Sequence, residues 1–345
     1  MSSHRRGGQA LAERLVGHWY RPQPSGASVL LWPLTLVYRA LRRWHVAVQA
    51  PAPRLPVPVL VVGNLIVGGA GKTPTVIALV QLLRAHGYRP GVVSRGHGRQ
   101  LQGLRAVGND SPAALVGDEP LLIHRRTGAP CWVGRDRPAA GEALLAAHPE
   151  VDLLICDDGL QHRRLQRDIE VIVFDERGAG NGMLLPAGPL REDLPAALGK
   201  NCLLLYNAAQ PSTPLPGELL QRHLGDAVPL QAWLADSAAG RMPLSALRGR
   251  RLLAAAGIAA PERFFNALEA EGLTITRMPL PDHHDFAAPP WPATGAEVIV
   301  TEKDAVKLTP AAPGSSPVWV VGLDFTIPPA SCRRLLQLLG HEDRP

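Results

Sequence analysis

The sequence has few cysteines and few aromatic residues, and it shows no repeat. Only 4 of the 345 residues are cysteine, none in a CxxC pair, so neither a disulfide framework nor a zinc site is expected and a reducing cytosolic setting is the simplest interpretation. Glycine and proline are frequent, at 34 each, but they have no three-residue period, which excludes a collagen-like chain. Hydrophobic residues make up 46% and charged residues 19%, which favours an ordered globular protein.

The chain also lacks an apolar run long enough to cross a bilayer, and no secretory signal is recognisable. In residues 28–44 the apolar run is short and is interrupted by Pro33. Leucine, tryptophan and tyrosine are followed there by Arg39, Arg42 and Arg43, a mixture typical of a helix that lies in a membrane interface. A helix packed on the protein's own core is the alternative.

Lysine is rare, although the net charge is +6 and the pI about 9.5. Almost all of the positive charge is therefore arginine, which favours bidentate phosphate contacts. The balance fits nucleic acid, an anionic membrane or a phosphorylated substrate, or simply an arginine-rich composition. Because no helix-turn-helix and no aromatic-basic interleaving is present, a nucleic-acid partner is not expected.

A glycine-rich turn follows the apolar, β-branched residues 57–63, which read as a buried parallel strand. The turn is Asn64-Leu-Ile-Val-Gly-Gly-Ala-Gly-Lys-Thr-Pro74, and a helical pattern follows over 75–86. Strand, glycine loop and helix form a P-loop, although Ile66 replaces the first glycine of the usual pattern. Lys72 is expected to reach the outer phosphates and Thr73 to bind Mg²⁺. The predicted nucleotide-binding residues of the turn are Gly68, Gly69, Ala70, Gly71, Lys72, Thr73 and Pro74.

Paired carboxylates occur at two further places. Residues 151–158 read as a second buried strand that ends in Asp157 and Asp158, the position of a magnesium-binding acid beside a P-loop, or else of two surface carboxylates. Asp118 and Glu119 precede an apolar helix, where they could cap the helix or accept a proton in catalysis.

Other polar clusters allow two interpretations each. Arg135 and Arg137 follow an expected strand and are either part of an anion site or solvated loop charges. Asp282-His-His-Asp285 is either a metal cluster or a cap with solvated histidines, and the segment from Thr301 to Asp304 usually forms a helix cap with exposed charges.

Seven motifs, in order along residues 28–325, together resemble one family. They are G-N-x-x-x-G-G-x-G-K-T-P, S-R-G, G-D-E-P, D-D-G-L-Q-H, L-P-A-G-P-L-R-E, D-H-H and T-E-K-D-A-V-K. The chain is similar to the tetraacyldisaccharide 4'-kinases, the ATP-dependent lipid A kinases of Gram-negative bacteria. The resemblance implies a Mg²⁺-dependent P-loop kinase that phosphorylates the 4'-hydroxyl of tetraacyldisaccharide 1-phosphate. It also implies a peripheral protein at the cytoplasmic face of the inner membrane.

The resemblance also suggests residue roles. Lys72 and Thr73 match the ATP-phosphate and magnesium residues, Asp118 the catalytic base, and His283 the histidine paired with that base, with His284 as the other possibility. The remaining matches are Asp157, Asp158 and Glu119 at the metal, Gln161 at the nucleotide, and Glu192 at the substrate. Arg135 and Arg137 are not matched in this way and are expected to contact the substrate phosphate. His97 stands where the family commonly has tyrosine.

The predicted fold is α/β, a P-loop parallel-sheet domain with a second, smaller α/β domain. The expected boundaries are an N-terminal membrane-interface segment over 1–50, a kinase domain over 51–199 with a helix from 325–345 packed on it, and a smaller domain over 200–324. Because His283 falls in the smaller domain, domain closure is expected to bring it to Asp118. A membrane-associated switch ATPase or GTPase is the alternative, although the N-K-x-D guanine motif is absent.

Overall fold

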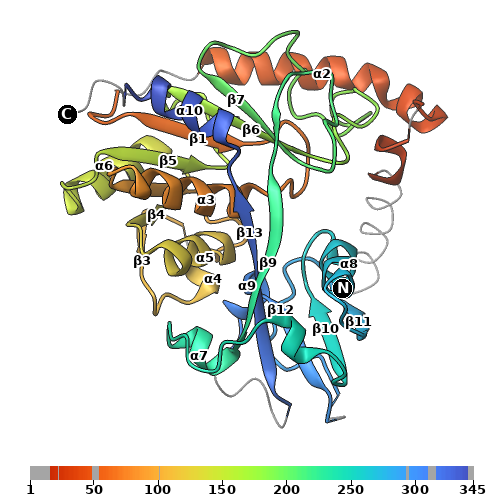
Figure 1. Cartoon of the computed structure of the whole chain (residues 1–345). Coiled ribbons are helices and arrows are strands. Elements are labelled where there is room, and N and C mark those ends of the chain that lie inside the picture. The colour runs from red at the N-terminus through yellow and green to blue at the C-terminus, as the bar shows by residue number, and fades with distance from the viewer. Residues whose placement is uncertain are drawn as a thin grey trace. The chain divides into compact units, whose positions relative to one another are not determined.

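The computed structural model describes residues 16–21, 23–48, 54–100, 102–292, 295–309 and 316–340 (Figure 1). The chain divides into two compact units. Unit 1 combines residues 1–72, 153–220 and 328–345, and unit 2 combines residues 73–152 and 221–327. The domain boundaries expected from the sequence follow chain order and stay a prediction.

Unit 1 is built on a parallel sheet with the strand order β5-β1-β6-β7-β8. All residues of β1 and β5 are buried, as expected for parallel strands covered on both faces. Val62 of β1 is paired with Asp157 of β5, so the segments that follow these two strands leave the sheet at the same edge. The strands are β1 (Val59–Gly63), β5 (Leu153–Asp157), β6 (Ile169–Asp175), β7 (Cys202–Asn207) and β8 (Glu218–Leu219). The unit also contains the helices α2 (Gly26–Val48) and α10 (Pro329–Leu338).

The first part of unit 2 contains three strands and the helices between them. β2 pairs with β4 in parallel, and β3 pairs with β4 antiparallel. The strands are β2 (Pro90–Ser94), β3 (Arg105–Val107) and β4 (Cys131–Val133). The helices are α3 (Lys72–Ala85), α4 (Ala113–Val116), α5 (Asp118–Thr127) and α6 (Arg137–Ala147). α3 begins where the chain passes from unit 1 into unit 2.

The second part of unit 2 is a five-stranded sheet with the order β11-β10-β12-β13-β9, parallel except for β9. The long strands β9 and β13 lie side by side (Figure 1). The strands are β9 (Gln221–Pro229), β10 (Leu252–Ala256), β11 (Ile275–Pro279), β12 (Glu297–Thr301) and β13 (Val318–Thr326). The helices are α7 (Leu230–Leu234), a 3-10 turn η1 (Leu244–Leu247), α8 (Pro261–Ala270) and α9 (Glu302–Ala305).

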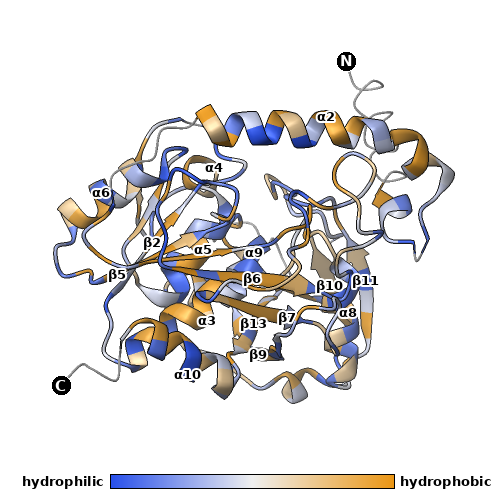
Figure 2. Cartoon of the chain, turned by 90° about the horizontal axis from the view of Figure 1, so that it is seen from above, coloured by the Kyte–Doolittle hydropathy of each residue, from blue (hydrophilic) through white to orange (hydrophobic). Residues whose placement is uncertain are grey.

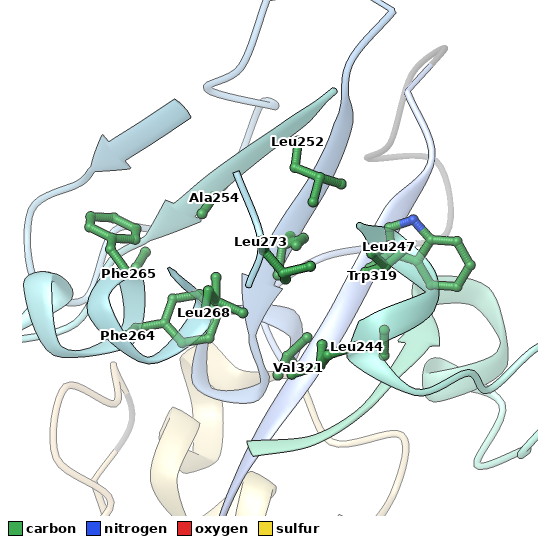
Figure 3. Close-up of a cluster of buried hydrophobic side chains, with 13 residues drawn as sticks. Leu244, Leu247, Leu252, Ala254, Phe264, Phe265, Leu268, Leu273, Trp319 and Val321 are labelled. Carbon is green, nitrogen blue, oxygen red and sulfur yellow. The ribbon is translucent and has the colours of Figure 1, made fainter. Parts of the chain in front are cut away.

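Alternate residues of this second sheet point to opposite faces and build two cores. On one face, Ala254 of β10 and Ile299 of β12 belong to a cluster with Phe264, Phe265 and Leu268 of α8 (Figure 3). On the other face, β10, β12 and β13 contribute a second cluster, which contains Leu253, Val298, Val300 and Val320. The sheet is therefore covered on both sides within unit 2.

The helix expected over residues 28–44 is confirmed as part of α2, which continues through Pro33. Unlike a helix packed on a protein core, α2 buries polar residues and exposes apolar ones. Its buried residues are Ser28 and Thr35, whereas Leu30 is 81% exposed and Trp44 65% exposed. Figure 2 shows hydrophobic residues recurring along α2. No helix within the described ranges has both the length and the apolar character needed to cross a membrane.

Candidate active site

The glycine-rich turn predicted as a P-loop connects β1 to α3, and Lys72 is the first residue of that helix. Gly68 and Gly71 have φ angles of +95° and +93°, a region that residues with a Cβ rarely adopt. Glycine is therefore required at both positions, as expected where a backbone must approach a phosphate closely. Thr73 and Pro74 follow in the first turn of the helix, and Thr73 is buried.

Side chains from elsewhere in unit 1 hold the carbonyl groups of this loop. The Asn64 amide donates to the Gly68 carbonyl at 3.0 Å, the Arg177 guanidinium donates to Gly69 at 2.7 Å, and the Asn207 amide donates to Ala70 at 3.1 Å. These contacts stabilise a loop conformation in which the glycine-rich backbone is shaped for an anion. Sequence reasoning assigned no role to Arg177 or Asn207, because nothing in the chain links residues 177 and 207 to a turn more than 100 positions earlier.

The carboxylate pair follows β5, as predicted. Asp157 is the last residue of the strand and is 1% exposed, whereas Asp158 follows with a φ of +47°. The Lys72 ammonium lies 3.5 Å from Asp158 Oδ1 and donates to Asn64 Oδ1 at 3.2 Å. The structure therefore brings the predicted phosphate-binding lysine and the predicted magnesium carboxylate together at one edge of the unit 1 sheet.

A second layer of polar residues lies behind Asp158. Arg191 Nη1 donates to Asp158 Oδ1 at 3.3 Å and to Gln161 Oε1 at 3.2 Å. Gln161 in turn donates to the Asn64 carbonyl at 3.2 Å and to Glu192 at 3.1 Å. Gln161 is thus bonded to the backbone of the P-loop segment, which places it beside the predicted nucleotide site. The sequence assigned no role to Arg191.

Glu192, predicted as a substrate residue, is buried at 5% exposure. Its carboxylate accepts hydrogen bonds from Gln161, from Arg163 at 2.7 Å and from Arg42 of α2. A buried carboxylate requires such partners, because an unpaired buried charge is strongly destabilising. Glu192 therefore connects α2 to the residues behind the P-loop.

Asp118 and His283 form a hydrogen-bonded pair within unit 2. Asp118 is the first residue of α5, and its Oδ2 lies 2.9 Å from His283 Nδ1. The His284 Nδ1 atom instead accepts the Phe286 backbone N–H at 3.1 Å, so His283 is the partner of Asp118. The pair already exists within one unit, so it does not require the domain closure that the sequence led us to expect.

Electrostatics favour the ionised form of Asp118. Burial opposes ionisation, but the hydrogen bond from His283 and the charges of His283, Lys303 and Lys307 outweigh it and lower the pKa of Asp118 below its ordinary value. The same hydrogen bond raises the pKa of His283, against the effects of burial and of Lys303. The His97 ring, where the family commonly has tyrosine, lies 5.8 Å from the His283 ring.

The other predicted residues of unit 2 have different surroundings. Glu119 Oε1 accepts a hydrogen bond from Lys303 at 3.0 Å. Arg135 is exposed, whereas Arg137 is buried and donates to the carbonyls of Gly134 at 3.4 Å and Arg135 at 2.9 Å. The guanidinium of Arg137 is thus bonded to the backbone at the start of its own helix α6.

The residues of unit 1 fit a magnesium nucleotide. Mg²⁺ usually keeps several waters and binds one or two carboxylates together with substrate phosphates. Asp157 and Asp158 supply two carboxylates of that kind, and Lys72 supplies the cation expected for an outer phosphate. Among the residues that the structure describes, no group of three or more His, Cys, Asp or Glu side chains could hold a metal by itself. No disulfide joins the four cysteines, all of which lie within the described residues.

Unit 2 also contains a cavity of about 680 Å³. Arg125, Arg126, Trp233 and Asp324 are among the residues that line it, and none of the predicted site residues does. This cavity is therefore separate from the Asp118–His283 pair.

The parallel sheet, the glycine loop before α3 and the carboxylates after the neighbouring strand define a P-loop nucleotide-binding protein of the α/β class. Comparison with known proteins narrows this class. The family model described as "Tetraacyldisaccharide-1-P 4'-kinase" matches residues 27–340, and the chain belongs to this family.

Relatives cover almost the whole chain. The tetraacyldisaccharide 4'-kinase of Methylibium petroleiphilum is 54% identical over 328 residues, which are 92% of this chain and 90% of that protein. The protein of the same name from Leptothrix cholodnii is 52% identical over 341 residues, 95% of this chain and 97% of that one. The fold is similar to the crystal structure of "apo" form LpxK from Aquifex aeolicus in complex with ATP. That similarity has a TM-score of 0.73 at 25% identity and covers 90% of this chain and 99% of that one.

Proposed function

We propose that this protein transfers the γ-phosphate of ATP to the 4'-hydroxyl of tetraacyldisaccharide 1-phosphate, a phosphotransferase step of lipid A biosynthesis. The observation that carries the proposal is the family match over residues 27–340 of a chain whose P-loop lysine, Lys72, lies 3.5 Å from Asp158. Phosphoryl transfer depends mainly on positioning and on charge stabilisation, and the residues of unit 1 are suited to both.

In this proposal, the residues of the P-loop and of the carboxylate pair after β5 bind and orient the nucleotide. The backbone of Gly68, Gly69, Ala70 and Gly71 surrounds the phosphates, and Lys72 contacts the outermost one. Thr73, Asp157 and Asp158 would hold Mg²⁺, which when bound would neutralise charge on the phosphates. Gln161 supports the nucleotide site through its hydrogen bond to the Asn64 carbonyl.

Asp118 is proposed as the group that accepts the proton of the 4'-hydroxyl. A general base must be ionised before the reaction, and the lowered pKa of Asp118 satisfies that requirement. His283 holds one oxygen of the carboxylate at 2.9 Å and thereby orients it. Glu119, Glu192, Arg135 and Arg137 remain proposed site residues, with Glu119 assigned to the metal and the other three to the substrate.

We further propose that α2 attaches the protein to the cytoplasmic face of the inner membrane. Leu30, Trp32, Leu41 and Trp44 of this helix are all more than half exposed, whereas its polar residues Ser28 and Thr35 are buried. A helix with an apolar outer face is suited to the boundary between headgroups and acyl chains. The acyl chains of the substrate would then remain in the bilayer while the sugar reaches the site.

The test is transfer of label from γ-labelled ATP to tetraacyldisaccharide 1-phosphate in detergent micelles. We expect a labelled bisphosphate product, and we expect no labelled lipid when the acceptor already carries a 4'-phosphate. ATP hydrolysis without any labelled lipid would contradict the proposal and would favour a switch ATPase.

A further inference from the structure

The segment Thr301–Lys307, which includes α9, departs from the exposed helix cap that its sequence suggests. The cap itself is present, because Thr301 Oγ1 accepts the Asp304 backbone N–H at 3.2 Å. Its charged side chains, however, are largely buried: Asp304 is completely buried, and the Lys307 side chain is 9% exposed. Burying a charged side chain is costly unless it has a partner. The partners of Asp304 and Lys307 therefore indicate the role of this segment.

Asp304 is bonded on both carboxylate oxygens. Its Oδ1 accepts a hydrogen bond from Lys307 at 3.0 Å, and its Oδ2 accepts the Thr301 hydroxyl at 2.8 Å and the Gly257 backbone N–H at 2.9 Å. Three donors from two parts of unit 2 therefore fix this carboxylate. A fixed carboxylate in turn fixes the Lys307 ammonium, which also lies 5.1 Å from the centre of the Phe286 ring.

From Asp304, two short paths lead to the Asp118–His283 pair. Lys307 Nζ lies 3.9 Å from Asp118 Oδ2, the same oxygen that contacts His283. On the other path, the Gly257 carbonyl accepts the His283 backbone N–H at 3.1 Å. A Cβ on residue 257 would lie 3.0 Å from Asp304 Oδ1 and 3.0 Å from the His284 Cβ, so Gly257 permits this close approach.

Lys303 makes a similar contact with Glu119, the residue next to Asp118. Its Nζ donates to Glu119 Oε1 at 3.0 Å and lies 4.0 Å from Asp282 Oδ1. The two lysines of the segment, four positions apart, thus contact two consecutive carboxylates at the start of α5. Opposite charges at these distances attract strongly where water is partly excluded.

We propose that Lys307, held by Asp304, is a positioning residue for the phosphoryl-transfer reaction. Lys307 fixes the Asp118 carboxylate through charge, while Asp304 fixes the His283 backbone through Gly257. The carboxylate is thereby held in the orientation that the hydroxyl proton requires. This inference rests on the proposed kinase function and on Asp118 as its base.

The experiment measures kcat and KM for both substrates in Lys307→Met, with Lys307→Arg as the charge-conserving variant and Lys200→Met as the matched control at an exposed lysine. Misplacing a catalytic group by about 1 Å can cost about 100-fold in rate. We expect kcat of Lys307→Met to fall between about 10- and 100-fold. The KM for ATP should stay within about twofold, and Lys307→Arg should recover most of the activity.

A double-mutant cycle separates positioning from general structural support. If Lys307 acts through Asp118, Lys307→Met should lower the residual rate of Asp118→Asn by less than about twofold, because residues that act as a unit are non-additive. The inference would be overturned if Lys307→Met lowered the rate equally in the wild type and in Asp118→Asn. It would also be overturned if Lys307→Met kept the wild-type kcat. Either result would leave the kinase function intact. Wild-type protein that labels no lipid would overturn the proposed function and this inference with it.

The partly exposed lysine provides a second variant in case Lys307→Met does not fold. Lys303→Met, whose side chain is 20% exposed in the wild type, removes the contact with Glu119 and the longer contact with Asp282, together with the weaker effect of the Lys303 charge on Asp118. We expect a smaller fall in kcat, at least about threefold, that shrinks in a Glu119→Gln background. A folded Lys303→Met variant with unchanged kcat would contradict the inference that charges of this segment position the carboxylates at the start of α5.

Discussion

The Tyr38 hydroxyl donates a hydrogen bond of 3.0 Å to the backbone carbonyl of Arg191, a residue 153 positions later in the chain. Arg191 also contacts Asp158, and its neighbour Glu192 accepts a hydrogen bond from Arg42. Two residues on the protein-facing side of α2 therefore contact the residues that surround a proposed magnesium ligand. The proposed membrane helix and the P-loop of unit 1 are parts of one hydrogen-bonded network.

From this network we predict that Tyr38→Phe and Arg42→Met lower kinase activity without weakening vesicle binding. Each variant removes a contact to the Arg191–Glu192 segment and leaves the apolar residues of α2 in place. We expect the double variant to lose about tenfold in kcat/KM for ATP, because the lost contacts hold the surroundings of Asp158. Label transfer and vesicle sedimentation, measured on the same preparation, check this. Equal losses of both properties would contradict it.

For the apolar outer face of α2 we expect the reverse, namely weaker vesicle binding without a loss of kinase activity. Leu30 and Leu41 are 81% and 59% exposed, so replacing both with serine should not disturb the fold. Each leucine that enters a membrane contributes roughly 1.5 kcal/mol or more. We therefore predict at least about tenfold weaker binding to anionic vesicles. The matched control replaces Leu219 and Leu323, exposed leucines on strands, with serine. Unchanged binding of the Leu30/Leu41 variant would contradict a membrane role for this face.

Lys72→Met should abolish most of the transfer activity. The lysine lies beside Asp158 and Asn64 at the start of α3, where it would stabilise charge on the transferred phosphate. Removing one such preorganised charge typically costs about 100-fold or more in kcat. Rapid-quench assays of label transfer measure this loss, and Lys200→Met should behave as the wild type. A variant with more than about one tenth of wild-type kcat would exclude Lys72 from this role.

The Asp118–His283 pair predicts a pH-dependent contribution to stability. The raised pKa of His283 means that its contribution is complete below the ordinary value of 6.5 and is lost as pH rises through the raised value. The lowered pKa of Asp118 means that its contribution is present above 3.8 and is lost as pH falls through the lowered value. The pair should therefore stabilise unit 2 most between these limits.

Urea unfolding of the wild type and of His283→Gln at several pH values tests this prediction. Because the His283 side chain is 36% exposed, we expect a difference of about 1 kcal/mol or less at its maximum near pH 5 to 6. The difference should shrink at pH 9. A difference that is independent of pH would contradict the ion pair.

Phe265→Ala should strongly destabilise the protein. Phe265 is completely buried on α8, within the cluster that covers one face of the second sheet (Figure 3). Replacing a buried phenylalanine with alanine typically costs about 3–5 kcal/mol, since apolar contacts are lost and a cavity remains. Leu323→Ala, at an exposed position, should change the free energy of unfolding by less than about 0.5 kcal/mol. Calorimetry of both variants makes the comparison.

Much of the fold and part of the site could be predicted from local sequence patterns. Apolar β-branched runs predicted β1 and β5, and the glycine turn predicted the start of α3 to within a few residues. The choice between His283 and His284 could not be predicted. The two residues are adjacent in the sequence, and the structure shows that His283, whose backbone has a φ of +58°, contacts Asp118.

The sequence by itself determined the P-loop, the carboxylates after the neighbouring strand and the family, because these depend on residue types at short, regular spacings. Only the tertiary structure decided which distant charges meet. The exposed charges expected between Thr301 and Asp304 are largely buried, and the nearby Lys307 is held against Asp118. Arg177, Arg191 and Asn207 contact the P-loop or the carboxylate beside it. Such contacts depend on how the chain folds back on itself, since burial makes each charge require a partner wherever in the sequence that partner lies.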